Sequence, residues 1–195
     1  MKNIVVLAFL LLGLMVSFAF QSPLPVLTVE KQTTSTVQWM TFEEAMEQAE
    51  TEPRKFFINI YTDWCSWCKH MEGTTYNDPA IAQFINDNYY AIKLDAEEEE
   101  AIQFKNKVYS FVKDGKRGHH ELAVEMMRGR WSFPTVVFLD ESKEIIQPVN
   151  GFKDPSEFEA IITYFAMDYY KKMPWSKYQR EYPEQKEVMY KGANK

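Results

Sequence analysis

The 195-residue sequence has few cysteines, few histidines and no excess of positive charge. Its net charge is −6, which argues against nucleic acid as a partner because nucleic-acid surfaces attract basic proteins. A four-ligand zinc site would have to be completed from His70, His119 and His120, since the chain has no second cysteine pair. Covalent haem attachment needs a histidine directly after the second cysteine, where Lys69 stands. The sequence therefore predicts neither a metal nor a haem cofactor.

A long apolar run occupies the N-terminus. Residues 4–20 are almost continuously apolar, and small residues at Ser17 and Ala19 fit a signal-peptidase site. We therefore predict a signal peptide over residues 1–19, with an uncleaved membrane anchor as the alternative. No cysteine lies near the end of the run, which excludes lipid attachment there. Either interpretation places the rest of the chain in an extracytoplasmic compartment.

The remaining chain divides into a linker, one domain and an extension. Residues 20–38 are rich in Pro, Thr and Ser and read as a linker, residues 39–172 as the domain, and residues 173–195 as a C-terminal extension laid over it. In the first half of the domain, helix caps and apolar runs alternate. They predict a helix capped by Thr41 and Glu44, a buried strand over 56–61, a helix from the cysteines to about Gly73, a helix after Asp78-Pro79 and a strand over 89–94.

The second half of the domain is predicted to continue with helices and a hairpin. Asp95 is expected to cap a helix with Glu97–Glu100 in its first turn and an apolar stripe reaching Val112. A short helix over 120–128, a hairpin of strands over 134–140 and 144–149, and a helix after Asp154-Pro155 complete the domain. The predicted fold class is α/β: a single domain with a mixed central sheet flanked by helices and a helical insertion over about 97–130.

The two cysteines, three residues apart, carry the chemical signal. A disulfide between Cys65 and Cys68 would close a loop too small to staple the fold. Only a thiolate attacks a disulfide, and a helix N-terminus lowers a thiol pKa through its free N–H groups and its dipole. We therefore expect Cys65 to be an exposed nucleophile and Cys68, one turn further along, to be a shielded resolving thiol.

The segment from Trp39 to about Ala166 resembles the thioredoxin superfamily. The resemblance rests on Phe56-Phe57-Ile58-Asn59-Ile60-Tyr61-Thr62-Asp63-Trp64-Cys65, on Phe133-Pro134-Thr135, and on a Trp-Cys-x-Trp-Cys-Lys motif similar to that of exported bacterial thioredoxin-like proteins. It implies a thioredoxin fold in the bacterial periplasm, with a redox-active disulfide as the only cofactor. It also implies a cis-proline at Pro134 beside the cysteine pair, and protein substrates with disulfides or thiols. A membrane electron donor is a further implied partner.

Two positions depart from the family pattern. Asn59 stands where thioredoxins carry a buried acid, so the proton of the resolving thiol would pass to water, Asp63 or another group. The predicted supporting residues of the site are Asn59, Asp63 and Lys69. The dipeptide between the cysteines is Ser66-Trp67, which leaves the direction of electron flow open.

Aromatic residues flank the cysteines and suggest a binding surface. Trp64, Trp67 and Trp131 would form a rim around Cys65 that favours unfolded or apolar substrates, with Phe133 and Pro134 at the substrate groove. The family resemblance instead implies that Trp64 packs beneath the active-site helix.

Three functions fit these features. The first is a thiol–disulfide oxidoreductase that reduces or isomerises disulfides. The second is a disulfide-donating oxidase, and the third is a non-catalytic module that binds a metal or a polypeptide.

Overall fold

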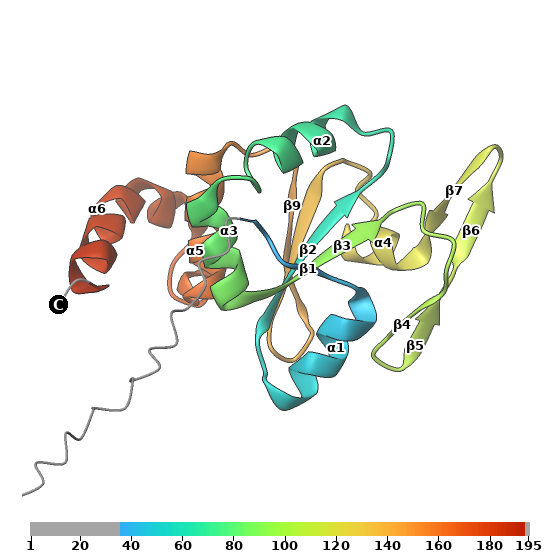
Figure 1. Cartoon of the computed structure of the whole chain (residues 1–195), viewed down its shortest axis with the longest axis horizontal. Helices are drawn as coiled ribbons and strands as arrows, with labels where there is room; N and C mark the ends of the chain where they lie inside the picture. The colour runs from blue at the N-terminus through green and yellow to red at the C-terminus, as the bar shows by residue number, and fades with distance from the viewer. Residues whose placement is uncertain (1–35, 194–195) are drawn as a thin grey trace, which may run out of the picture. The chain divides into compact units, whose positions relative to one another are not determined.

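A computed structural model of the chain describes residues 36–193. They form a five-stranded sheet, two small hairpins and the helices around them (Figure 1). The predicted signal peptide or anchor, and most of the predicted linker, lie outside the described residues. Val37, at the end of that linker, is 7 % exposed and packs in the core. No helix within the described range is long and apolar enough to cross a membrane.

The central sheet is mixed, with strand order β1-β3-β2-β8-β9. Strands β1, β3 and β2 are parallel, β8 is antiparallel to β2, and β9 is antiparallel to β8. The five strands are Trp39–Met40 (β1), Lys55–Tyr61 (β2), Tyr89–Asp95 (β3), Thr135–Leu139 (β8) and Ile145–Asn150 (β9). This arrangement confirms the predicted mixed α/β sheet.

The helices begin where the sequence places their caps. The capping box of α1 is complete: the Glu44 N–H donates to Thr41 Oγ1 at 3.2 Å, and the Thr41 N–H donates to Glu44 Oε2 at 2.9 Å. Asp78 and Asp154 cap α3 and α5, each followed by proline in the first turn. The helices of the first and last parts of the domain are Phe42–Thr51 (α1), Ser66–Gly73 (α2), Pro79–Asn88 (α3) and Pro155–Ala166 (α5).

Both faces of the sheet are covered. Phe57 and Phe138 point to one face, where they pack against residues of α3 and α5. Ile58 and Ile60 point to the other face, against residues of α1 and α4. Alternation along each strand sends neighbouring side chains to opposite faces, so β2 is buried on both sides and is the rigid centre of the domain.

The prediction of a helix after Asp95 is wrong. The segment instead forms two antiparallel hairpins, β4–β5 and β6–β7, before the short helix α4. The spacing of the apolar residues was misleading because apolar residues of short strands also recur at helix-like intervals. Two-residue loops at Lys105-Asn106 and Gly115-Lys116 interrupt the segment and divide it into strands. The acidic run Glu97–Glu100 follows β3 and belongs to no helix. The elements of this insertion are Ile102–Phe104 (β4), Lys107–Tyr109 (β5), Phe111–Asp114 (β6), Arg117–His120 (β7) and Glu121–Met126 (α4).

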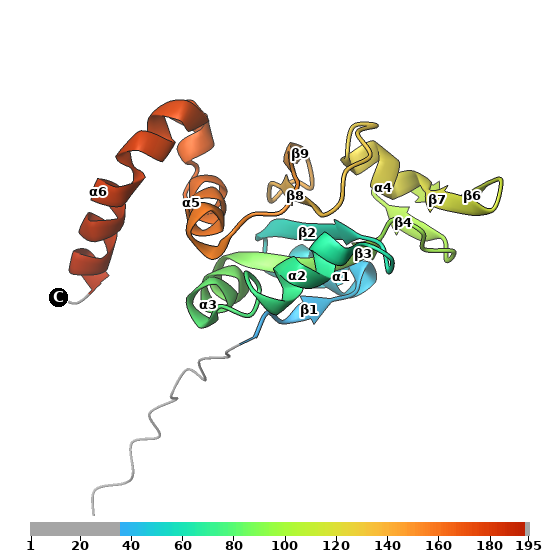
Figure 2. The same cartoon turned by 90° about the horizontal axis from the view of Figure 1, so that it is seen from above.

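The C-terminal extension is largely one helix. After α5 come the short 3-10 helix Tyr169–Lys171 (η1) and the helix Trp175–Ala193 (α6). Tyr178 is fully buried and its ring centroid lies 4.9 Å from that of Tyr164 in α5. The start of α6 therefore contributes to the core. Both views place α6 at one end of the domain and the β6–β7 hairpin at the other (Figures 1 and 2).

Candidate active site around Cys65 and Cys68

Strand β2 leads directly to the cysteine pair. The buried strand is followed by a tight turn in which the Cys65 N–H donates to the Thr62 carbonyl at 3.1 Å. Cys65 is the N-cap of α2, and its Sγ accepts a hydrogen bond from the Cys68 N–H at 3.0 Å. Both cysteines therefore lie at the helix N-terminus that the sequence predicts, where free N–H groups and the helix dipole stabilise negative charge on Cys65.

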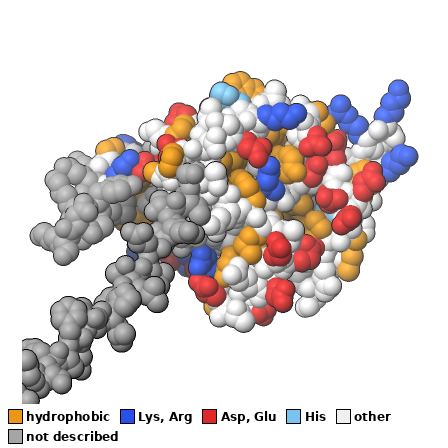
Figure 3. Space-filling view, viewed as in Figure 1, with side chains coloured by type: hydrophobic (Ala, Val, Ile, Leu, Met, Phe, Trp, Pro, Cys, Tyr) orange, Lys and Arg blue, Asp and Glu red, His pale blue; other side chains and the backbone are white. Residues whose placement is uncertain are grey.

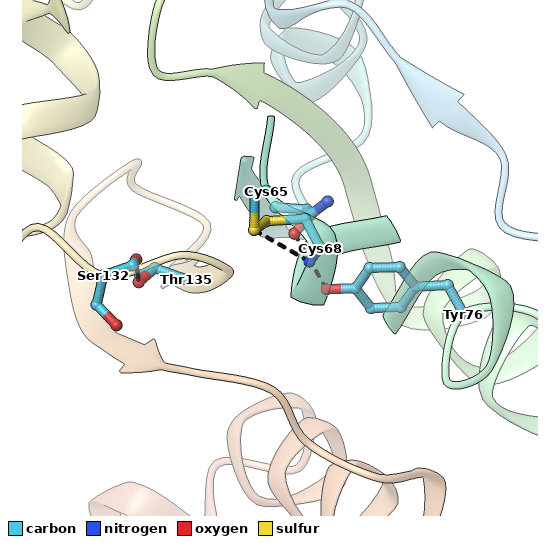
Figure 4. The surroundings of a disulfide bond; sticks show 6 residues. Cys65, Cys68, Tyr76, Ser132 and Thr135 are labelled. Carbon is cyan, nitrogen blue, oxygen red and sulfur yellow. Dashed lines mark hydrogen bonds between the residues drawn. A yellow bond between two sulfur atoms is a disulfide. The ribbon is translucent and has the colours of Figure 1, made fainter. Parts of the chain in front are cut away.

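The two cysteines form a disulfide in the structure (Figure 4). Each side chain is 6 % exposed, so the oxidised pair does not show the predicted contrast between an exposed and a shielded thiol. The difference lies in position: Cys65 lines a pocket of about 670 Å³, and Cys68 is not among its lining residues. A partner thiol arriving through this pocket therefore meets Cys65.

The loop before β8 forms another wall of this pocket. The Phe133–Pro134 peptide bond is cis, and Phe133 lines the pocket. The loop is fixed by two hydrogen bonds, from the Gly151 N–H to the Pro134 carbonyl at 2.8 Å and from the Thr135 hydroxyl to the Ser132 carbonyl at 2.6 Å. Figure 4 shows Ser132 and Thr135 across from the disulfide.

Asn59 lies inside the domain, paired with a tyrosine. The Tyr76 hydroxyl donates to Asn59 Oδ1 at 3.1 Å, and the Asn59 side chain is 4 % exposed. Burial raises the pKa of Tyr76 well above its ordinary value. Figure 4 shows the Tyr76 hydroxyl pointing toward Cys68. The buried polar groups at this position are therefore neutral amide and phenol, with no carboxyl group in the pair.

Of the other expected supporting residues, Asp63 and Lys69 are both exposed, and neither forms an ion pair with another described residue. Asp63 belongs to an acidic group beside the active-site turn. Burial raises the pKa of Asp95, and the negative charges of Asp63 and Glu97 raise it further. Figure 3 shows acidic side chains scattered over the visible face, whereas basic side chains gather at the tip of the β6–β7 hairpin.

The exposed tryptophans correct one expectation. Trp64 is 53 % exposed and does not pack beneath α2. Trp67 and Trp131 are also exposed, and Trp67 contacts the Phe152 ring with a centroid distance of 5.4 Å. All three tryptophans line the pocket together with Cys65 and Phe133, which agrees with the predicted aromatic rim.

Three pocket residues were not predicted as site residues, because no hairpin was expected between Glu97 and His120. Arg117 and His119 lie on β7, and Glu97 lies in the loop after β3; all three line the pocket. The local signal for this hairpin is Gly115, which opens the two-residue loop Gly115-Lys116 with a positive φ that glycine adopts readily. Within residues 36–193, no group of three or more His, Cys, Asp or Glu side chains is placed to hold a metal ion.

A central mixed sheet, a Cys-x-x-Cys disulfide at a helix N-terminus and a neighbouring proline loop define a thioredoxin-fold protein of the disulfide-oxidoreductase type. The chain belongs to the family described as "Thioredox_DsbH: Protein of unknown function, DUF255", whose model matches residues 26–181.

Known proteins show the same relationship. The chain is 28% identical over 116 residues to the uncharacterized protein B0495.5 of Caenorhabditis elegans, covering 59% of this chain and 14% of that protein. It is 28% identical over 122 residues to the thiol:disulfide interchange protein DsbD of Photorhabdus laumondii, covering 62% of this chain and 18% of that protein. The chain thus spans less than a fifth of the length of these relatives.

A solved structure supports the fold. A thioredoxin-fold protein from Helicobacter pylori superposes with a TM-score of 0.50 at 14% identity, covering 73% of this chain and 87% of that one. At this identity the similarity establishes the fold alone.

Proposed function

We propose that this chain is an exported thiol–disulfide oxidoreductase that reduces or isomerises disulfides in periplasmic proteins. The observation that carries the proposal is the Cys65–Cys68 disulfide at the N-terminus of α2, with Cys65 on the wall of an open pocket. The apolar segment over residues 4–20 supports export, and the family relationship supports the redox chemistry.

The reaction follows from the placement of the two sulfur atoms. In the reduced protein, the Cys65 thiolate attacks one sulfur of a substrate disulfide, that disulfide breaks, and the departing substrate thiolate takes up a proton. The Cys68 thiolate then attacks Cys65 Sγ and releases the second substrate thiol. The protein thereby becomes oxidised and the substrate gains two electrons. A membrane dithiol donor would restore the reduced pair.

The surroundings of the pair match these two roles. The Cys68 N–H, which donates to Cys65 Sγ at 3.0 Å, would stabilise the attacking thiolate. The Asn59–Tyr76 pair offers no ionisable carboxylate for Cys68, so we expect its proton to leave to water. Phe133 would border the segment of substrate that lies beside Cys65, with the buried Pro134 next to it in the chain, and Trp64 and Trp67 would contact the side chains of the substrate.

Single cysteine variants test the proposal with dithiothreitol-driven reduction of insulin disulfides. Cys65→Ser is expected to abolish the reaction, because it removes the attacking sulfur. Cys68→Ser is expected to leave a stable mixed disulfide on Cys65, visible as a mass increase under non-reducing conditions. Full activity in Cys65→Ser would refute the proposal.

The redox potential of the pair decides the direction of electron flow. Equilibration in glutathione or dithiothreitol buffers, followed by an alkylating mass tag, measures it. A value near that of thioredoxin, about −270 mV, supports a reductant, and a value toward about −120 mV supports a disulfide-donating oxidase. If the pair forms no disulfide in any buffer, the metal- or polypeptide-binding alternative replaces both.

A further inference from the structure

Two of the exposed tryptophans near Cys65 are held in place although they face solvent. Trp64 is 53 % exposed and Trp131 is 49 % exposed, and both line the Cys65 pocket. Exposed apolar surface of this kind marks a site of interaction when it is contiguous. Both rings contact Phe133 and a residue of β7.

Trp64 is held from three directions. Its Nε1–H donates to Glu97 Oε2 at 3.1 Å. The Arg117 guanidinium lies over its ring, 4.9 Å from the ring centroid. The Phe133 ring meets it edge to face at 5.8 Å. These residues come from the loop after β3, from β7 and from the loop before β8, so three separate segments converge on one exposed side chain.

Trp131 is held in a similar way. The His119 ring meets it edge to face at 5.5 Å, and the Phe133 ring at 5.8 Å. Phe133 therefore contacts both tryptophans, and the three rings form a continuous wall. An aromatic surface that is already ordered loses little conformational entropy when a partner binds, which favours recognition.

Strand β7 supplies one of the side chains that contact each tryptophan. Arg117 and His119 are two residues apart, so their side chains lie on one face of the strand. The opposite face fixes the hairpin to the body of the domain: His120 is fully buried, and its N–H donates to the Ala96 carbonyl at 2.8 Å. The hairpin thus presents Arg117 and His119 to the active site from an anchored base.

We propose that the β6–β7 hairpin is a substrate-recognition element of the Cys65 site. Arg117 and His119 are positioning residues that hold Trp64 and Trp131 as walls of a subsite for a bulky apolar side chain next to the substrate's reactive cysteine. This inference rests on the proposed function, because the disulfide exchange itself brings a polypeptide cysteine to Cys65.

The chemistry of the pocket favours an apolar side chain over a charged one. Arg117 is the only Lys or Arg among the pocket residues, and it is opposed by Glu97 and Asp114. The pocket therefore has no strong charge of either sign. Its volume of about 670 Å³ lies within the range that holds sizeable ligands, so the pocket has room for an aromatic side chain against the wall of Trp64, Phe133 and Trp131.

The test uses two disulfide-linked peptide dimers that differ only in the residue after cysteine, which is phenylalanine in one and serine in the other. The reduced full chain is mixed with each, and the single-turnover rate is followed by acid quenching and an alkylating mass tag. Each rate is divided by that of dithiothreitol with the same peptide, which removes intrinsic reactivity. We expect the phenylalanine peptide to react about five- to tenfold faster, as one buried aromatic contact provides.

Variants of the hairpin locate the preference. Arg117→Ala, His119→Ala and the double variant are expected to bring the rate ratio close to one, because the phenylalanine peptide loses its ordered aromatic wall. Lys113→Ala is the matched control, because it removes a cation from the same hairpin on the opposite face and is expected to keep the ratio. Trp131→Ala removes one wall directly and is expected to lower the ratio as well. Far-UV circular dichroism and the urea midpoint verify folding.

The possible results separate this inference from the proposed function. If the wild-type chain prefers phenylalanine and the double variant keeps that preference, the role of the hairpin is refuted. Equal wild-type rates with both peptides refute the apolar subsite and leave the oxidoreductase intact. If the reduced chain reacts with neither peptide, the proposed function fails and this inference fails with it.

Discussion

Replacing Tyr178 by alanine is expected to destabilise the whole domain, although the residue lies in the C-terminal extension. Tyr178 is fully buried, and its ring centroid lies 4.9 Å from those of Tyr164 and Tyr169. Truncation of a large buried aromatic side chain removes its transfer free energy and leaves a cavity, which together cost about 3–5 kcal/mol. In a domain of this size we expect a fall in Tm of roughly 10 °C.

A second substitution at the same position separates the ring from the hydroxyl group. The Tyr178 hydroxyl is buried and finds no hydrogen-bond partner among residues 36–193. A buried hydroxyl without a partner is unfavourable, so Tyr178→Phe, which keeps the ring, is expected to raise the free energy of unfolding by up to about 1 kcal/mol. The two variants should therefore change stability in opposite directions.

Urea unfolding of the oxidised full chain, followed by circular dichroism and tryptophan fluorescence, measures both changes. The slope of the free energy against urea should stay constant if only stability changes. If Tyr178→Ala lowers the free energy of unfolding by less than about 1 kcal/mol, α6 does not contribute to the core as the structure shows. If Tyr178→Phe is clearly destabilising, the hydroxyl group has a partner and the second part of the reasoning is wrong.

Three further predictions concern the cap of α1, the buried histidine and the hairpin. Thr41→Ala removes the capping box and should lower the free energy of unfolding by about 1 kcal/mol, with Thr41→Ser as the control that keeps the cap. Burial lowers the pKa of His120, so its contribution to stability is complete above the unfolded pKa of about 6.5 and is lost as pH falls toward the folded pKa. His120→Asn keeps a side chain that can cap the Leu122 N–H. Between pH 7 and pH 5, the urea midpoint of this variant should fall less than that of the wild type. Equal falls in the two proteins would show that His120 does not cause the loss of stability at low pH. Gly118→Ala forces the Phe111 ring to move and should lower stability by roughly 1–3 kcal/mol and speed proteolysis of the hairpin, whereas Gly73→Ala, where nothing lies within 4 Å, should show no steric clash.

The sequence alone determined those parts of the fold whose signals are local. The capping box at Thr41 and the Asp-Pro pairs before α3 and α5 fix helix starts through contacts within a few residues. Residues 56–60 are buried on both faces because all of them except Asn59 are apolar. A strand followed at once by Cys65 and Cys68 at a helix start is likewise a local pattern, and it is sufficient to locate the redox pair.

The insertion between β3 and β8 is the part of the fold that the sequence did not predict correctly. Its apolar residues fit a helical stripe and short strands about equally well, so their spacing did not decide between the two. The two-residue loops and the long-range burial of Ile102 and Phe104 against α1 and neighbouring strands favour the hairpins. That burial depends on residues distant in the chain, and such contacts override local propensity.

Tertiary structure also decided the character of the active-site rim. The sequence identified Trp64 and Phe133 as neighbours of the cysteine pair, and nothing local shows whether a tryptophan beside a helix start is buried or exposed. Trp64 faces the pocket because Glu97 and Arg117, 33 and 53 positions further along the chain, meet it there. The turn after β3 positions Glu97, and the register of β6 with β7 positions Arg117. Residues this far apart in the sequence come into contact with Trp64 only when the whole domain has folded.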